Sequence, residues 1–132
     1  MNVLEKQIGG THYNELSYQP IELIYKLDLG FIQGNIIKYI TRWRCKNGVE
    51  DLKKAEHYCE LGFYYEETNS KYSNRYRYTS SHIVNEANKY VEQNSLTNTE
   101  KAIIVFVALG QYLNAKKIIA EFIEKHNNVK KA

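Results

Sequence analysis

The chain has 132 residues, of which 43% are hydrophobic and 25% are charged, and its formal net charge is +3. This composition is typical of one compact domain with a buried core, and it excludes wholesale disorder. The weak net charge argues against a protein that coats nucleic acid, because such proteins carry a strongly basic face. We therefore expect residues 1–132 to form a single domain.

The bulk sequence also limits the cellular setting. The N-terminal stretch has no apolar run of signal-peptide length, and the most apolar segment, Ala102–Leu109, is too short to span a bilayer. Cys45 and Cys59 are the only cysteines and form no C-x-x-C pattern, which favours reduced thiols over a disulfide framework. We expect a cytoplasmic protein without a membrane partner.

The first twenty residues contain a loop at Gly9-Gly10, where the backbone can approach a ligand closely. His12 and Tyr13 follow it, and they either contact a ligand or belong to an ordinary surface loop. Pro20 suits the first position of a short helix that ends near Leu27, because its missing N–H costs nothing there. A turn at residues 28–30 separates this helix from the next.

The stretch from residue 31 to residue 48 predicts a central helix with two distinct faces. Ile36, Ile40 and Trp43 fall on an apolar face. The opposite stripe follows the spacing i, i+3, i+4, i+7 and i+11 and carries cations and neutral donors: Asn35, Lys38, Tyr39, Arg42 and Lys46. Asn47-Gly48 is expected to end the helix, since both residues accept the left-handed conformation.

A second helix is expected from Val49 to about residue 63, with Glu50 and Asp51 in the first turn, where the macrodipole favours carboxylates. Together the two helices form a helical hairpin within residues 9–65. Residues 66–80 are polar and rich in tyrosine and arginine, so we expect an exposed loop, with a strand as the weaker alternative.

The C-terminal region, residues 81–127, predicts further helices. One runs from His82 to about Gln93, and a long one is capped by Thr97 or Asn98 and continues to about residue 126. Gly110 interrupts the long helix, and its segment 102–109 is apolar nearly all round. Because so small a chain hardly encloses such a helix, we expect part of it to face another subunit. Residues 127–132 should form a solvated tail.

The predicted fold is therefore all-α, with a central helical hairpin, a long C-terminal helix and a homo-oligomeric assembly. On the donor stripe, lysine and arginine supply charge-assisted hydrogen bonds to phosphate oxygens, asparagine can read a ribose or base edge, and tyrosine can stack. The alternative is a solvated helix face, as most basic stripes are. If the two hairpin helices pack antiparallel, Asp51 could pair with Arg42 or Lys46 and hold it in position.

Several catalytic signatures are missing from the sequence. There is no G-x-x-x-x-G-K-[ST] phosphate loop and no D-x-D pair to hold Mg²⁺. The histidines at positions 12, 57, 82 and 126 and the two cysteines have no metal-ligand spacing. We therefore expect neither a metal site nor a cofactor, assign no catalytic residue, and favour a binding protein over an enzyme.

The central stretch resembles a small phage domain of unknown function, often called SaV-like or "nucleotide kinase". The similar positions in the hairpin are Gly34-Asn35, Lys38-Tyr39, Arg42-Trp43, Lys46-Asn47-Gly48, Asp51-Leu52, Lys54-Ala55 and Tyr58. His12-Tyr13 and Gln19-Pro20-Ile21-Glu22 resemble its upstream elements. The resemblance covers residues 9–65, about half the chain. It implies a phage protein acting in the cytoplasm of an infected bacterium.

These observations favour a non-catalytic protein that binds a phosphate-bearing nucleotide. Its ligand residues would be His12, Tyr13, Asn35, Lys38, Tyr39, Arg42, Lys46 and Asp51. By analogy with phage "sponges", the ligand would be a bacterial immune signal, such as an ADP-ribose-derived or cyclic nucleotide. One alternative is a deoxynucleoside monophosphate kinase without a phosphate loop, as the resemblance implies. Another is an adaptor that binds a host protein through its tyrosine-rich loop.

Overall fold

The computed structural model describes residues 2–10, 15–68 and 78–131, and over these it confirms the all-α prediction. Two 3₁₀ turns, η1 (Val3–Glu5) and η2 (Trp43–Cys45), accompany six α-helices. The helices are α1 (Pro20–Lys26), α2 (Phe31–Arg42), α3 (Val49–Thr68), α4 (Ser80–Gln93), α5 (Asn98–Ala108) and α6 (Tyr112–Lys131). None of the helices in these ranges is both long and apolar enough to cross a membrane.

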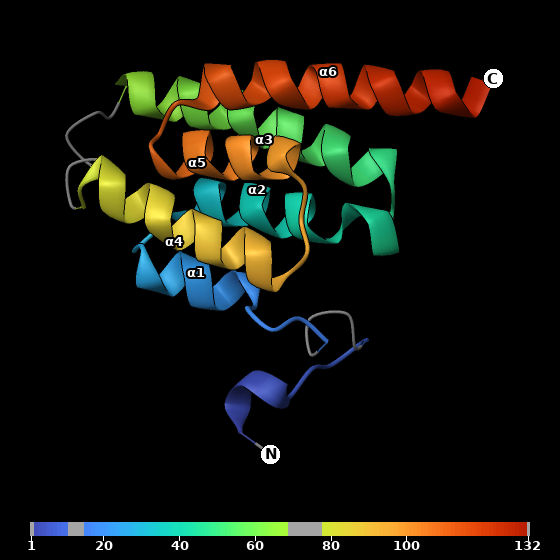
Figure 1. The fold of residues 1–132 in the computed structure, drawn as a ribbon. Helices are drawn as coiled ribbons and strands as arrows, with labels where there is room; N and C mark the ends of the chain where they lie inside the picture. The colour runs from blue at the N-terminus through green and yellow to red at the C-terminus, as the bar shows by residue number, and fades with distance from the viewer. Residues whose placement is uncertain (1, 11–14, 69–77, 132) are drawn as a thin grey trace.

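The six helices stack as three layers of two (Figure 1). α3 and α6 form one outer layer, α2 and α5 form the middle layer, and α1 and α4 form the other outer layer. The middle layer is therefore covered on both sides, and it contributes core side chains without exposure to water, among them Ile36, Ile40, Ile103 and Ile104. Burial of such side chains is the main favourable contribution to folding.

The predicted hairpin is confirmed by the packing of α2 against α3. Ile36, Ile40 and Trp43 are buried, as the apolar face of the sequence predicted. Gly48 has a φ of +60°, which is the left-handed conformation expected before the second helix. α3 then runs to Thr68, five residues past the predicted end.

The prediction that Lys46 continues the α2 stripe is wrong. The α-helix ends at Arg42 and continues as the 3₁₀ turn η2. Lys46, which follows this turn, is no longer helical, with φ −131° and ψ −86°. The cause lies far along the sequence, because Trp43 and Arg44 are drawn to the buried carboxylate of Glu100 on α5. Lys46 is exposed beyond this corner.

The C-terminal region agrees with its prediction at Gly110 and differs at the end of the chain. Gly110, with φ +76°, divides the expected long helix into α5 and α6, which confirms the interruption predicted there. α6 continues to Lys131, where a solvated tail was expected, since asparagine and lysine do not prevent a helix from continuing. Thr97 caps α5 as predicted, its side chain accepting from Glu100 N.

The apolar helix α5 is packed inside its own chain by α2, α4 and α6. These three helices cover α5 without a second subunit, and the oligomeric state stays a prediction. Of the expected loop at 66–80, residues 66–68 belong to α3 and Ser80 begins α4, while residues 69–77 lie outside the described ranges.

Candidate functional site

α1 and α2 each begin with a local contact between a backbone N–H and the side chain three residues further on. At α1, Gln19 N donates to the Glu22 carboxylate at 2.7 Å, and Pro20 takes the first helical position. At α2, Gly30 N donates to the Gln33 side-chain oxygen at 2.9 Å, and Gln33 Nε2 donates to Val107 O at 3.0 Å. Gln33 thus caps α2 and ties it to α5.

Of the two partners that the sequence allowed for Asp51, Arg42 and Lys46, the structure has Arg42. The Asp51 carboxylate accepts from Arg42 Nε at 3.3 Å and from Arg42 Nη2 at 3.4 Å. It also accepts from Asn47 Nδ2 at 3.3 Å, and Lys54 Nζ lies 4.0 Å away. The Asp51 side chain is 0% exposed, so this carboxylate is a buried anchor that orients Arg42.

Three cations surround the ring of Tyr39, and we call Lys38, Arg42 and Lys54 the cation cluster. Lys38 Nζ, Arg42 Cζ and Lys54 Nζ lie 4.7, 4.9 and 5.7 Å from the ring centroid. Tyr39 in turn stacks on Tyr58 of α3, with centroids 5.9 Å apart and planes 28° apart. The α2–α3 hairpin therefore gathers positive charge around an aromatic ring.

The surroundings of Lys38 disfavour its charged form. Burial lowers the pKa of its amine, and the nearby charges of Arg42, Lys46 and Lys54 lower it further, while Asp51 acts in the opposite direction. The site therefore holds more positive charge than its buried carboxylate offsets. An anion placed beside Lys38 would relieve this repulsion.

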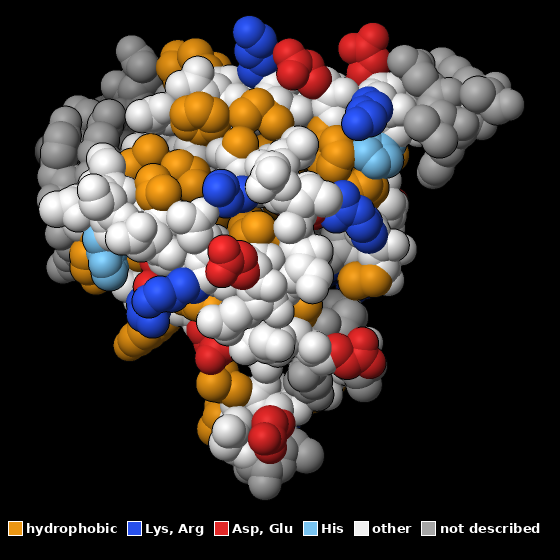
Figure 2. All heavy atoms as spheres, in the orientation of Figure 1, with side chains coloured by type: hydrophobic (Ala, Val, Ile, Leu, Met, Phe, Trp, Pro, Cys, Tyr) orange, Lys and Arg blue, Asp and Glu red, His pale blue; other side chains and the backbone are white. Residues whose placement is uncertain are grey.

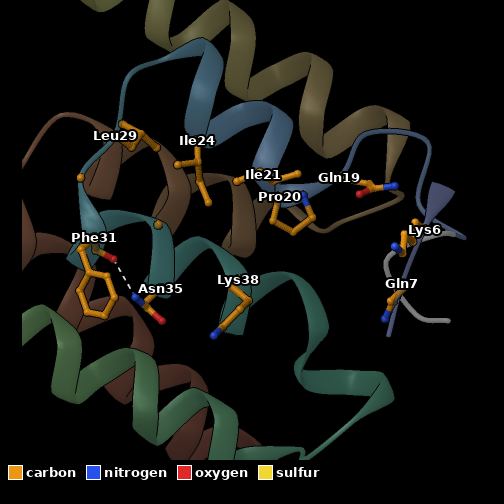
Figure 3. Close-up of a pocket in the computed structure, with 12 residues that line it drawn as sticks. Lys6, Gln7, Gln19, Pro20, Ile21, Ile24, Leu29, Phe31, Asn35 and Lys38 are labelled. Atoms are coloured by element: carbon orange, nitrogen blue, oxygen red, sulfur yellow. Dashed lines mark hydrogen bonds between the residues drawn. The ribbon is translucent and has the colours of Figure 1, made fainter. Parts of the chain in front are cut away.

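A cavity of about 430 Å³ lies between α1 and the first half of α2, and we call it the α1–α2 pocket (Figure 3). Its wall is mainly apolar, and Asn35 and Lys38 bring polar groups to it. The lining residues are Lys6, Gln7, Gln19, Pro20, Ile21, Ile24, Leu29, Gly30, Phe31, Gly34, Asn35 and Lys38. A largely apolar cavity with a few polar groups is the usual form of a small-molecule site.

The structure thus brings together some of the residues predicted for the site. Asn35 and Lys38 line the pocket, and Tyr39, Arg42 and Asp51 lie beside it in and around the cation cluster. Lys46 lies outside the cluster on the exposed corner, and His12 and Tyr13 fall outside the described residues.

Sequence reasoning missed the apolar part of the pocket. Ile21 and Phe31 line it although they are 53% and 76% exposed. The sequence does not distinguish these two residues from core residues, because only the packing of α1 on α2 shows that they are apolar and exposed at once.

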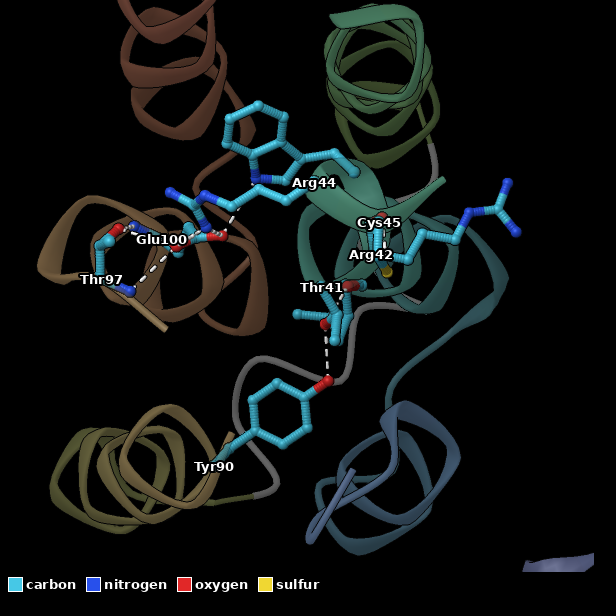
Figure 4. Close-up of polar contacts among 9 residues, drawn as sticks. Thr41, Arg42, Arg44, Cys45, Tyr90, Thr97 and Glu100 are labelled. Carbon is cyan, nitrogen blue, oxygen red and sulfur yellow. Dashed lines mark hydrogen bonds and ion pairs between the residues drawn. The ribbon is translucent and has the colours of Figure 1, made fainter. Parts of the chain in front are cut away.

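The corner after α2 is fixed by Glu100 (Figure 4). Its carboxylate is 0% exposed and accepts from Trp43 Nε1 at 3.0 Å and from Arg44 Nη1 at 2.6 Å. Thr97 donates to the same carboxylate through its N–H at 2.9 Å and its hydroxyl at 2.8 Å. Arg44 consequently points towards α5, whereas Arg42 points to the opposite side of the corner.

The charges on the outer surface do not indicate a second binding site on the face in view. On the face in Figure 2, basic and acidic side chains are interspersed, so the net positive charge is not gathered there. Within the described ranges, no group of three or more His, Cys, Asp or Glu side chains is arranged to hold a metal ion.

Comparison with known proteins supports an uncharacterised domain in the first half of the chain. A family model described as "Protein of unknown function (DUF3310)" matches residues 9–60. The match covers most of the stretch 9–65 that carried the resemblance, and less than half of the 132 residues. Searches of curated proteins and of solved structures found no match.

Proposed function

We propose that this protein binds a phosphate-bearing nucleotide without changing it chemically, at the junction of the α1–α2 pocket and the cation cluster. The observation that carries the proposal is the position of Lys38. It lines the apolar pocket and also belongs to the group of cations around Tyr39. A ligand with an apolar, flat part and an anionic part matches these two surroundings.

The electrostatics support an anionic ligand. Asp51 is already engaged by Arg42 and Asn47, so its charge is shared among several donors. Burial and the neighbouring cations lower the pKa of Lys38, and a bound phosphate would raise it. Arg42, held by Asp51, adds fixed positive charge next to it.

The finer identity of the ligand rests on the resemblance and on analogy. A small phage protein that holds a nucleotide unchanged would counter host defence by sequestering an immune signal, such as an ADP-ribose-derived or cyclic nucleotide. This role places the protein in the cytoplasm of an infected bacterium. We also propose a homo-oligomer that uses the C-terminal helix, on which Leu113 is 51% exposed.

The direct test is mass spectrometry of small molecules released by heat from protein recovered out of infected, defence-active cells. A released, chemically intact nucleotide is the expected result. Diphosphates formed from dTMP or dGMP with ATP and Mg²⁺ would instead show a kinase. No thermal shift with any nucleotide would contradict both and favour an adaptor.

Lys38→Gln is the variant that locates the site. It should abolish nucleotide binding, and Lys53→Gln, which removes an exposed lysine of α3 and changes the net charge equally, should not. Arg42→Ala is a poorer test, because it leaves the buried Asp51 carboxylate without its main partner and weakens the fold itself. Equal binding by the two lysine variants would place the ligand elsewhere.

A further inference from the structure

Three side chains of α2 form a row along the α1–α2 pocket: Phe31, Asn35 and Lys38. Their spacing of i, i+4 and i+7 puts them on one face of the helix, and Figure 3 shows all three pointing to the same side. At a rise of 1.5 Å per residue, the row spans about 10 Å along the helix axis. It passes from an aromatic ring, through an amide, to a cation.

Phe31 is placed as a stacking surface. It is 76% exposed although it is a large apolar residue at the wall of a cavity. Tyr58 of α3 holds it from one side in an edge-on contact, with centroids 6.3 Å apart and planes 67° apart. A ring that is fixed on one side and open to solvent on another suits stacking with a flat ligand group.

Asn35 is oriented by its own helix. Its Nδ2 donates to Phe31 O at 2.8 Å, which directs the amide and fixes which end carries the oxygen. The Oδ1 atom can then accept from an amino group, and the second N–H can donate to an adjacent ring nitrogen. This pair of groups is the one with which asparagine recognises adenine.

Gly34 lines the pocket next to Asn35 and has no side chain to fill it. It is buried where α2 touches α1, and a Cβ atom there would lie only 3.2 Å from Ile24 Cδ1 of α1. A side chain at this position would therefore push against the α1 wall and narrow the space beside Asn35.

We propose that the base of the nucleotide lies in the α1–α2 pocket, stacked on Phe31 and hydrogen-bonded by Asn35, with its phosphate at Lys38. This inference rests on the nucleotide binding proposed above and names the ligand class: nucleotides whose base carries an amino group, as adenine does and uracil does not. Along one face of α2, the row places the two base contacts, Phe31 and Asn35, before the phosphate contact, Lys38.

The test is isothermal titration of the full chain with three probes: AMP, UMP and ribose 5-phosphate. AMP should bind about ten-fold tighter than ribose 5-phosphate or more, because stacking of a base on an aromatic side chain has an effect of this size. UMP should fall between them. Phe31→Ala should reduce the affinity for AMP to that for ribose 5-phosphate. Asn35→Ala should reduce the affinity for AMP to that for UMP.

Tyr25→Ala is the matched control, since Tyr25 is an 87% exposed aromatic residue of α1 that is not among the residues lining the pocket. It should leave all three affinities unchanged. The base site would be overturned by equal affinity for AMP and ribose 5-phosphate, or by an unaltered AMP affinity in Phe31→Ala. In either case Lys38→Gln would still weaken the binding of every probe. If Lys38→Gln changes nothing, or no probe binds, the nucleotide-binding proposal fails as well.

Discussion

Replacing Asp51 with asparagine tests the buried ion pair that orients Arg42 over Tyr39. The carboxylate is 0% exposed, and the Arg42 side chain that it binds is 12% exposed. Asparagine has nearly the same volume, so it opens no cavity. It removes the negative charge, however, and it replaces one acceptor oxygen with a donor that faces Arg42 or Asn47.

The expected loss of stability follows from the burial and the distances. Removing one partner of a buried ion pair costs about 3–5 kcal/mol. The contacts with Arg42, at 3.3 and 3.4 Å, are longer than strong charge-assisted hydrogen bonds, so we expect a smaller loss of about 2–3 kcal/mol. For a domain of this size, that loss corresponds to a decrease in Tm of roughly 6–12 °C.

Thermal and urea unfolding followed by circular dichroism measure this loss. Glu60→Gln is the matched control, because Glu60 lies on the same helix and pairs with Lys116 at 3.7 Å, with side chains 52% and 39% exposed. An exposed pair of this kind contributes less than about 1 kcal/mol. If Asp51→Asn proves as stable as Glu60→Gln, the carboxylate is not the anchor described here.

Three further predictions concern stability. Glu100→Gln should cost about 1–3 kcal/mol of stability and change the fluorescence of Trp43, because a buried donor loses its acceptor. The control is Glu50→Gln, which changes an acid in the first turn of α3 and should cost less than about 1 kcal/mol. Equal losses of stability in the two variants would refute the role of Glu100. Burial would raise the pKa of the Glu86 carboxyl, but hydrogen bonds from Tyr18 and Lys26 hold this pKa below its ordinary value of 4.5. The ionised carboxylate therefore stabilises the fold above that pH, and this stability is lost as the pH falls below it. An equally steep acid unfolding transition in Glu86→Gln would contradict this. A chain of residues 1–65 should show no cooperative thermal transition, because it lacks α5, which forms the middle layer together with α2. A sharp transition would show that the hairpin folds alone.

The parts of the fold that depend on neighbouring residues could be predicted from the sequence. The two faces of α2, the left-handed Gly48 and the cap of Thr97 on α5 are all set within a few residues. The pairing of Asp51 with Arg42 was also within reach, because the two helices follow each other with a short connection.

The parts that depend on distant residues could not be predicted. α2 ends early because Arg44 binds Glu100, 56 residues further on, and no local pattern announces this contact. The α1–α2 pocket likewise arises from the packing of two helices, so Ile21 and Phe31 had no distinguishing signal. The binding of a nucleotide, the assignment of His12 and Tyr13 to the site and the oligomeric state stay predictions.

The three-layer arrangement places the α1–α2 pocket and the helices that support it in different parts of the chain. Among the described residues, those that line the pocket come from the N-terminal arm, α1, α2 and the turn between these helices, while α5 holds α2 from behind through Glu100 and Val107 O. Substitutions at these α5 contacts should therefore alter how firmly the pocket is held without altering the residues that line it. Such a division would let the front of the molecule acquire a new ligand while its scaffold stays the same.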